Sequence, residues 1–279
     1  MVGVCVVRFV AVADEPEESA RVSLPRLIPW IEVNTIGEDA VDNAAAGLAV
    51  WGRITDTAIV STVPGCDTIY RRLRGLVPGM RIIPGMKTSR CMSRFDSVEG
   101  WKKVAHEVRL VCAASGEKRV ALENEGAVKG YWRGEYEIDL DRLRAGLNEL
   151  PKDIEFIWYP ALVGENETAQ DRTEAVCRIV SEVLNVRFTD FSAAGPRSLR
   201  YGWTLAASKR MKQVARNPTI PILYFHGPGS RWWQDDQIHE ALAATEGKSV
   251  IVYPGITRWR EAARSFVDTL LKGGVPERP

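Results

Sequence analysis

The chain has 279 residues, 45% hydrophobic and 26% charged, with a formal net charge of +1. This balance is ordinary for a folded globular protein and excludes a largely disordered or fibrous chain. A net charge near zero provides no overall field for nucleic acid or an anionic membrane, and no apolar stretch is long enough to span a bilayer. We therefore expect no nucleic acid and no membrane among the partners.

The first 24 residues are predicted to form a flexible tail. An apolar stretch ends in Ala-Val-Ala at residues 11–13, and an acidic run that starts at Asp14 follows it. This order is that of a secretory signal peptide and its cleavage site, although a positively charged beginning is absent. Two locations therefore stay open, an exported one (periplasmic or extracellular) and a cytoplasmic one.

After this tail, eight short apolar runs alternate with patterns of helical periodicity. The runs cover residues 28–33, 57–61, 80–84, 119–123, 155–159, 187–190, 221–225 and 249–253, and the clearest helical patterns cover residues 98–114, 139–150, 173–184 and 258–271. Such alternation indicates parallel strands, and eight units in about 250 residues match a TIM barrel. No G-x-G-x-x-G follows a strand, as it often does in an open doubly wound sheet. We predict an α/β fold with one (β/α)8 TIM-barrel domain over residues 25–275.

Cysteine and histidine do not form a metal-binding pattern. None of the five cysteines belongs to a C-x-x-C pair, and Cys112 and Cys177 lie in helical patterns, where buried free thiols are expected. Of the three histidines, His106 and His239 fall in predicted helices, and only His226 follows a strand. We therefore predict a metal-independent site without a cofactor.

Polar and aromatic side chains gather where the predicted strands end, which is where a TIM barrel holds its active site. The candidates for substrate binding are Glu32, Asn34, Lys87, Asn124, Trp158, Tyr159, Tyr224, His226 and Tyr253. Aromatic rings stack on the apolar faces of sugars, and carboxylates supply the acid and base of glycoside hydrolysis. We expect a carbohydrate or another small polar ligand. Trp101 lies in a helical pattern and should pack against the barrel, whereas Trp132 should lie in a loop after the fourth strand.

Two carboxylates at the end of the fourth run are the leading catalytic candidates. If the strand continues through Glu123 and Glu125, both side chains point to one face, because side chains alternate along a strand. Neighbouring carboxylates repel when both are ionised, which raises the pKa of one of them and suits a general acid. We predict Glu125 as the acid and either Glu123 or Asp190 as its partner, with Glu32 as a further candidate.

On these residues the chain resembles TIM-barrel glycoside hydrolases. The pair Asn124-Glu125 resembles the Asn-Glu pair of the large clan of retaining β-glycosidases, which implies that Glu125 is the acid/base. That clan has a nucleophilic Glu at the end of strand seven, where this chain has His226. Glu123-Asn124-Glu125 and Thr189-Asp190 are also similar in placement to the Asp-x-Glu and Tyr-Asp pairs of chitinase-like family 18 enzymes.

Two other functions stay open. Gly-Pro-Gly-Ser at residues 227–230 and Pro-Gly at residues 254–255 come after the last two strands, where TIM barrels often bind phosphate. They favour a phosphosugar lyase, aldolase or isomerase with Lys87 as a Schiff-base or electrophilic residue. The absence of a carboxylate at the end of strand seven favours a non-catalytic carbohydrate-binding barrel.

Overall fold

The computed structural model describes residues 27–33, 38–132, 134–159, 167–189, 220, 222–224, 242, 245, 247–253 and 259–279. The tail predicted over residues 1–24 lies outside these ranges, as do Asn34, Asp190 and His226. Among the described residues, no helix is both long and apolar enough to cross a membrane.

Eight strands form one sheet in which all the pairings seen between them are parallel. They are β1 (Leu27–Val33), β2 (Thr57–Thr62), β3 (Arg81–Lys87), β4 (Arg119–Glu123), β5 (Glu155–Tyr159), β6 (Val186–Phe188), β7 (Ile222–Tyr224) and β8 (Val250–Tyr253). Their order in the sheet is β6-β5-β4-β3-β2-β1-β8-β7. Each strand overlaps one predicted run, so the prediction of eight parallel strands is confirmed.

The sheet curls, and its two outer strands come together at one point. Thr189, directly after β6, forms a parallel bridge with Ile220, which lies just before β7. The backbone N–H of Ile220 donates to the carbonyl of Phe188 at 2.8 Å. The fold is therefore an α/β single domain of the TIM-barrel type, with a cyclic order of strands.

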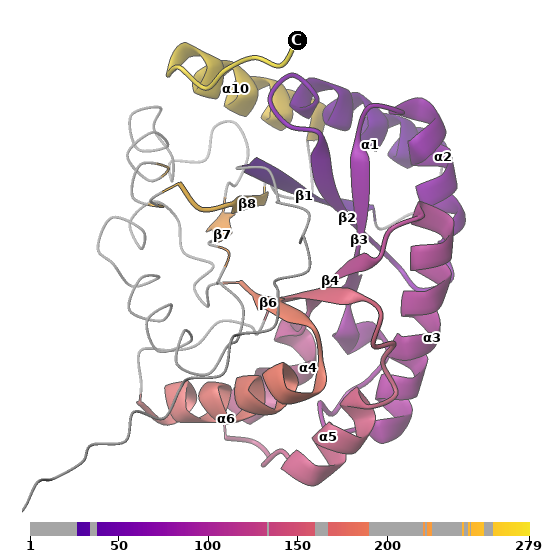
Figure 1. Cartoon of the computed structure of the whole chain (residues 1–279), viewed down its shortest axis with the longest axis vertical. Coiled ribbons are helices and arrows are strands. Elements are labelled where there is room, and N and C mark those ends of the chain that lie inside the picture. Colours follow the sequence, from indigo (N-terminus) through magenta and orange to yellow (C-terminus); the bar gives the residue numbers. More distant parts are fainter. Residues whose placement is uncertain are drawn as a thin grey trace, which may run out of the picture.

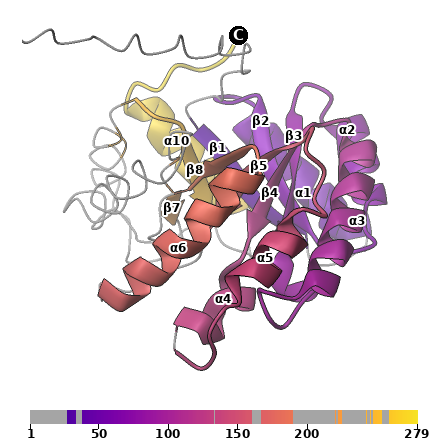
Figure 2. The ribbon, with the colours of Figure 1, turned by 60° about the horizontal axis from the view of Figure 1, so that its bottom comes forward.

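Helices cover the outside of this curled sheet. They are α1 (Glu38–Trp51), α2 (Thr68–Leu76), α3 (Val98–Ser115), α4 (Glu125–Trp132), α5 (Leu140–Leu147), α6 (Glu167–Val183) and α10 (Trp259–Lys272), with a short 3-10 helix, η1 (Thr88–Arg90), after β3. Figure 1 shows α10, α1, α2, α3, α5 and α6 following one another around the strands, and Figure 2 shows the same outer layer from a second direction. The four predicted helices are present as α3, α5, α6 and α10.

Strand side chains alternate between two apolar clusters, as the pleat requires. The inner cluster fills the barrel and contains Ile28, Trp30, Ile59, Ile83, Ala121, Ile157, Tyr159, Ile220 and Ile251. The outer cluster lies between the strands and the helices, and there Trp158 stacks on Trp101 with ring centroids 5.8 Å apart. Trp101 is fully buried, so its predicted packing role is confirmed. Cys177 is a buried free thiol, as expected, and Cys112 is a partly buried one.

Charged residues occupy the barrel at the end where the strands begin. Glu155, the first residue of β5, accepts from the Nε atoms of Arg119 on β4 and Arg187 on β6, both at 2.5 Å. Arg119 and Glu155 are buried. We refer to Arg119, Glu155 and Arg187 as the lower triad.

The last residues of the chain lie against the same end. The backbone N–H of Arg278 donates to the carbonyl of Arg53 at 2.7 Å, and Nε of Arg53 donates to Glu277 at 2.6 Å. Arg53 also forms an ion pair with Asp268 on α10. The C-terminus is thereby fastened to the segment between α1 and β2.

Candidate functional site

A lysine shared by two glutamates lies at the other end of the barrel, where the strands end. The ammonium of Lys87 on β3 is 2.7 Å from a carboxylate oxygen of Glu32 on β1 and 3.5 Å from one of Glu123 on β4. The Glu32 side chain is only 2% exposed, whereas those of Lys87 and Glu123 are 22% and 16% exposed. We refer to Glu32, Lys87 and Glu123 as the upper triad. Of its three members, Lys87 and Glu123 are the two that a ligand can reach from solvent.

The strand register explains why these three side chains meet. Lys87 and Glu123 are partners at the last pairing position of β3 and β4, so their side chains lie next to each other. Glu32 lies two strands away from Lys87, across β2, whose residue Ser61 is the register partner of both Glu32 and Gly85. A Cβ on Gly85 would lie about 3.1 Å from the Ser61 Cβ, a tight contact that would require Ser61 to shift. With only a hydroxymethyl group and a glycine between them, the long Lys87 side chain reaches Glu32.

The environment of Lys87 stabilises its charged form. Burial lowers the pKa of its amine, but the hydrogen bond that it donates to Glu32 and the negative charges of Glu123 and Glu32 outweigh this effect. The pKa of Lys87 is therefore raised, and the side chain is an ammonium at neutral pH. An ammonium next to a carboxylate favours the ionised form of that carboxylate, which is the form of a base or a nucleophile.

Tyrosines lie beside the upper triad on the inner side of the barrel. Tyr159 is the register partner of Glu123 and belongs to the inner cluster. Tyr253, at the end of β8, is partly exposed and packs against the same cluster. Tyr224 is its register partner on β7, although the structure describes only the Tyr224 backbone. The predicted residues Glu32, Lys87, Glu123, Tyr159 and Tyr253 therefore lie at the same end of the barrel, where the strands end.

Asn124 lies at the same end, but its side chain is fully buried. The amide Nδ2 donates to the Tyr159 carbonyl at 2.9 Å, and Oδ1 accepts from the Thr88 hydroxyl at 2.9 Å. The prediction that Asn124 binds substrate is therefore corrected, because both ends of its amide are engaged with the protein. The Asn124 side chain therefore no longer supports the resemblance to the Asn-Glu pair of retaining β-glycosidases.

The backbone at Glu125 differs from the prediction. β4 ends at Glu123, and Glu125 is the first residue of α4. Glu123 and Glu125 are therefore not neighbours on one face of a strand, since the chain changes from strand to helix between them. The prediction that Glu125 is the acid concerns a side chain outside the described part of the structure.

Trp158 and Trp132 also depart from their predictions. Trp158 is fully buried in the outer cluster, so it does not line the cavity. The reason is the alternation of the pleat: consecutive residues face opposite sides, and Tyr159 is the one that faces inward. Trp132 is the last residue of α4 and not part of a loop.

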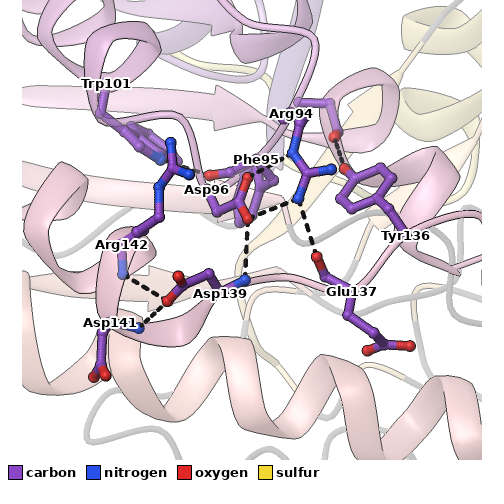
Figure 3. Close-up of polar contacts among 10 residues, drawn as sticks. Arg94, Phe95, Asp96, Trp101, Tyr136, Glu137, Asp139, Asp141 and Arg142 are labelled. Carbon is purple, nitrogen blue, oxygen red and sulfur yellow. Dashed lines mark hydrogen bonds and ion pairs between the residues drawn. The ribbon is translucent and has the colours of Figure 1, made fainter.

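A polar network fixes the loops behind the site (Figure 3). The Asp96 carboxylate, in the loop before α3, accepts from Arg94 at 3.0 Å and from the backbone N–H of Asp139 at 3.0 Å. Asp139 caps the N-terminus of α5, and its side chain accepts from the N–H groups of Asp141 and Arg142, both at 3.1 Å. The connections after β3 and β4 are thereby joined. Burial alone would raise the pKa of Asp96. The hydrogen bonds that its carboxylate accepts from Arg94 and Asp139 have the larger combined effect, so the pKa is lowered.

Sequence reasoning missed Thr88, the residue that comes after Lys87 and holds Asn124. The available signal was a hydroxyl residue directly after a strand-end lysine. In the described part of the chain, His, Cys, Asp and Glu form no group of three that could hold a metal ion.

Comparison with known proteins identifies the fold and leaves the family open. No protein-family model matches the sequence, and no curated protein matches it. Among solved structures, a D-allulose 3-epimerase from Methylomonas sp. in complex with D-allulose is similar, with a TM-score of 0.54, 13% identity, and coverage of 90% of this chain and 98% of that one. The spore cortex-lytic enzyme SleL of Bacillus cereus has a TM-score of 0.51 at 10% identity, covering 88% of this chain and 74% of that one. The endo-β1,6-glucanase BT3312 has a TM-score of 0.51 at 9% identity, covering 91% and 78%.

Proposed function

We propose that this protein is a carbohydrate-active enzyme that hydrolyses a glycosidic bond at the upper triad. Glu123 acts there as the base or nucleophile. The observation that carries the proposal is the position of Glu123, at the end of β4 and 3.5 Å from an ammonium. Such a carboxylate is kept ionised and is within reach of a ligand, while Glu32 is buried behind Lys87 as its counter-ion.

Glycoside hydrolysis requires a second carboxyl group that protonates the leaving oxygen. We assign this role to Glu125, two residues beyond Glu123 and at the start of α4. Glu123 is unsuited to it because the neighbouring Lys87 ammonium favours loss of its proton. Tyr253, which is partly exposed, supplies a ring surface at the same end of the barrel, which suits a sugar substrate, whereas Tyr159 is buried beneath it in the inner cluster.

The structural neighbours support this class of substrate by analogy only. The names of the solved structures refer to a sugar epimerase, a spore cortex-lytic enzyme and a glucanase. At such low identity the likeness concerns the fold, and one fold hosts many chemistries.

The test is hydrolysis of a panel of aryl glycosides and oligosaccharides by the wild type, Glu123→Gln and Glu125→Gln. Each variant should lose about 10²–10⁴-fold in activity and still bind the substrate, because the amide keeps the shape and removes the proton chemistry. Stability should change by less than about 1 kcal/mol, since Glu123 is partly solvated. Addition of azide to Glu123→Ala should restore turnover and yield a glycosyl azide if Glu123 is the nucleophile.

Full turnover by Glu123→Gln on a substrate that the wild type cleaves would remove Glu123 from the chemistry, and the same result for Glu125→Gln would remove Glu125. Binding of glycans without turnover by the wild type would instead indicate a carbohydrate-binding barrel.

A second candidate function is proton transfer on a free sugar, as in an isomerase. The observation that favours it is the pairing of a carboxylate base with an ammonium, which can stabilise the oxygen of an enediolate. Incorporation of solvent deuterium into a sugar carbon, abolished in Glu123→Gln, would support it. The raised pKa of Lys87 disfavours a Schiff-base lyase, because the attacking amine must be neutral.

A further inference from the structure

We infer that Asn124, held by Thr88, is a positioning residue that fixes the backbone on which both proposed catalytic residues stand, Glu123 on one side and Glu125 on the other. The inference rests on the proposed function, since it concerns the groups to which that proposal assigns the chemistry. Asn124 itself does not touch the substrate.

Lys87 and Glu123 lie at the position where the pairing of their two strands, β3 and β4, ends. The next residues, Thr88 and Asn124, belong to neither strand. The last pair of a ladder is held from one side only, so its spacing depends on the contacts of the two residues beyond it.

Hydrogen bonds of Asn124 and Thr88 replace the ladder beyond this point. The Thr88 hydroxyl lies 2.9 Å from Asn124 Oδ1 and 3.1 Å from the Glu123 carbonyl, which joins the end of β3 to the end of β4. The Asn124 amide and backbone N–H both donate to the Tyr159 carbonyl, at 2.9 and 3.2 Å, which joins β4 to β5. The ends that carry Lys87, Glu123 and Tyr159 are thus connected through one buried amide.

The same residue begins α4. The carbonyl of Asn124 accepts from the N–H groups of Ala127 and Val128, both at 3.1 Å, so the first turn of the helix is built on it. The next position is also tight, because a Cβ on Gly126 would lie 2.6 Å from the Ser89 Cβ of η1. The start of α4, and with it the backbone of Glu125, is therefore placed by Asn124 and η1.

Replacement of Thr88 tests whether its hydroxyl group positions Lys87 and Glu123. Thr88→Val keeps the shape and removes the hydroxyl, whereas Thr88→Ser keeps the hydroxyl and is the matched control. Thr88→Cys, a weaker donor of similar size, is a second variant if the valine protein does not fold. The measurement is the rate of acetylation of Lys87 by limiting acetic anhydride, read by mass spectrometry, with the exposed Lys102 as internal reference.

In Thr88→Val, acetic anhydride should acetylate Lys87 about two- to fivefold faster than in wild type. This is the factor expected when a partly exposed ion pair with Glu123 is weakened. Thr88→Ser should match wild type, and Lys102 should not change in either variant. On a substrate that the wild type cleaves, Thr88→Val should lower kcat and leave KM nearly unchanged, because binding groups stay in place.

Equal labelling of Lys87 in Thr88→Val and Thr88→Ser would overturn the inference. The labelling needs no substrate, so the two proposals can fail separately. Faster labelling without glycosidase activity in the wild type would leave the positioning role intact and remove the proposed function. Unchanged labelling in an active glycosidase would do the reverse.

Discussion

The two ends of the barrel carry ionic triads of opposite composition. At the ends of the strands one lysine, Lys87, is shared by two glutamates, whereas at the beginnings of the strands one glutamate, Glu155, is shared by two arginines. In the lower triad both contacts of the Glu155 oxygens with Nε atoms are short, at 2.5 Å. In the upper triad the contacts are graded, 2.7 Å to the buried Glu32 and 3.5 Å to the more exposed Glu123.

Under the proposed function, this difference separates a structural use of charge at the lower triad from a chemical use at the upper triad. Two arginines on one buried carboxylate cross-link β4, β5 and β6 and leave that carboxylate no oxygen for a ligand. In the upper triad, the Glu123 carboxylate lies 3.5 Å from the Lys87 ammonium, and both side chains are partly exposed. TIM barrels in general place stability at the strand beginnings and catalysis at the strand ends, and the two triads fit that division.

Glu155→Gln is the substitution with the largest expected effect on this contrast. The change leaves Arg119 and Arg187 charged and without the carboxylate between them, and removal of one partner of a buried ion pair costs about 3–5 kcal/mol. Burial already lowers the pKa of Arg119 despite the attraction of Glu155. The free energy of unfolding from a urea titration measures the effect. Glu117→Gln breaks the ion pair of Arg81 with Glu117, which is less buried than the pair of Arg119 with Glu155; it is the control and should cost less.

A loss below about 1 kcal/mol in Glu155→Gln would mean that the lower triad adds little to stability. The lower triad would then have no structural role that distinguishes it from the upper triad.

Lys87→Met tests the upper triad, with a smaller expected loss of about 1.5–3 kcal/mol, because the buried Glu32 loses a charged hydrogen-bond donor. The loss should depend on pH. The folded-state pKa of Lys87 is raised, so its stabilisation is complete below its unfolded pKa of about 10.4 and disappears as the pH rises through the folded value. The difference in unfolding free energy between wild type and Lys87→Met should therefore be constant near neutral pH and shrink at strongly alkaline pH. A difference that grows with rising pH would contradict the shared-ammonium geometry.

The sequence was sufficient to predict the strands because each is a short apolar run, and the strands whose side chains the structure describes are largely buried on both faces. The strand-end positions of Glu32, Lys87, Glu123, Tyr159 and Tyr253 could also be predicted, since each residue is at or next to the end of such a run. Their part in a binding or catalytic site stays a prediction. These residues keep the geometry of the strand that precedes them.

The errors have two sources, the alternation of side chains within a strand and the change from strand to helix. Trp158 and Tyr159 were both assigned to the cavity, although adjacent residues of a strand face opposite sides. The interpretation of Glu123 and Glu125 as one pair required the strand to continue, whereas the buried amide of Asn124 ends it and begins α4. Local periodicity does not reveal such a change, because it depends on contacts with Thr88 and Tyr159 from other strands.

The lower triad was missed, although a signal was present. Three successive predicted runs begin with, or next to, Arg119, Glu155 and Arg187, charges of alternating sign at equivalent positions. Parallel pairing brings the beginnings of neighbouring strands together, so such charges are expected to form ion pairs inside a barrel.

Asp96→Asn asks whether position or burial decides the role of a carboxylate. Asp96 lies on the same side of the barrel as the upper triad, but it is buried and joins two loops (Figure 3). The asparagine can still accept from the N–H of Asp139 and loses only the charge that attracts Arg94, so we expect a loss of about 1 kcal/mol in unfolding free energy. The folded-state pKa of Asp96 is lowered, so its contribution is present above the unfolded pKa of about 3.9 and is lost as the pH falls through the folded value. Urea titrations at several pH values should show a constant difference in unfolding free energy between wild type and variant near neutrality, and a smaller difference in acid.

Activity, where a substrate is known, should stay within about twofold of wild type, since Asp96 does not belong to the proposed chemistry. A large loss of activity with unchanged stability would place Asp96 with Glu123 and show that position at the strand ends, rather than exposure, determines which carboxylates serve the reaction.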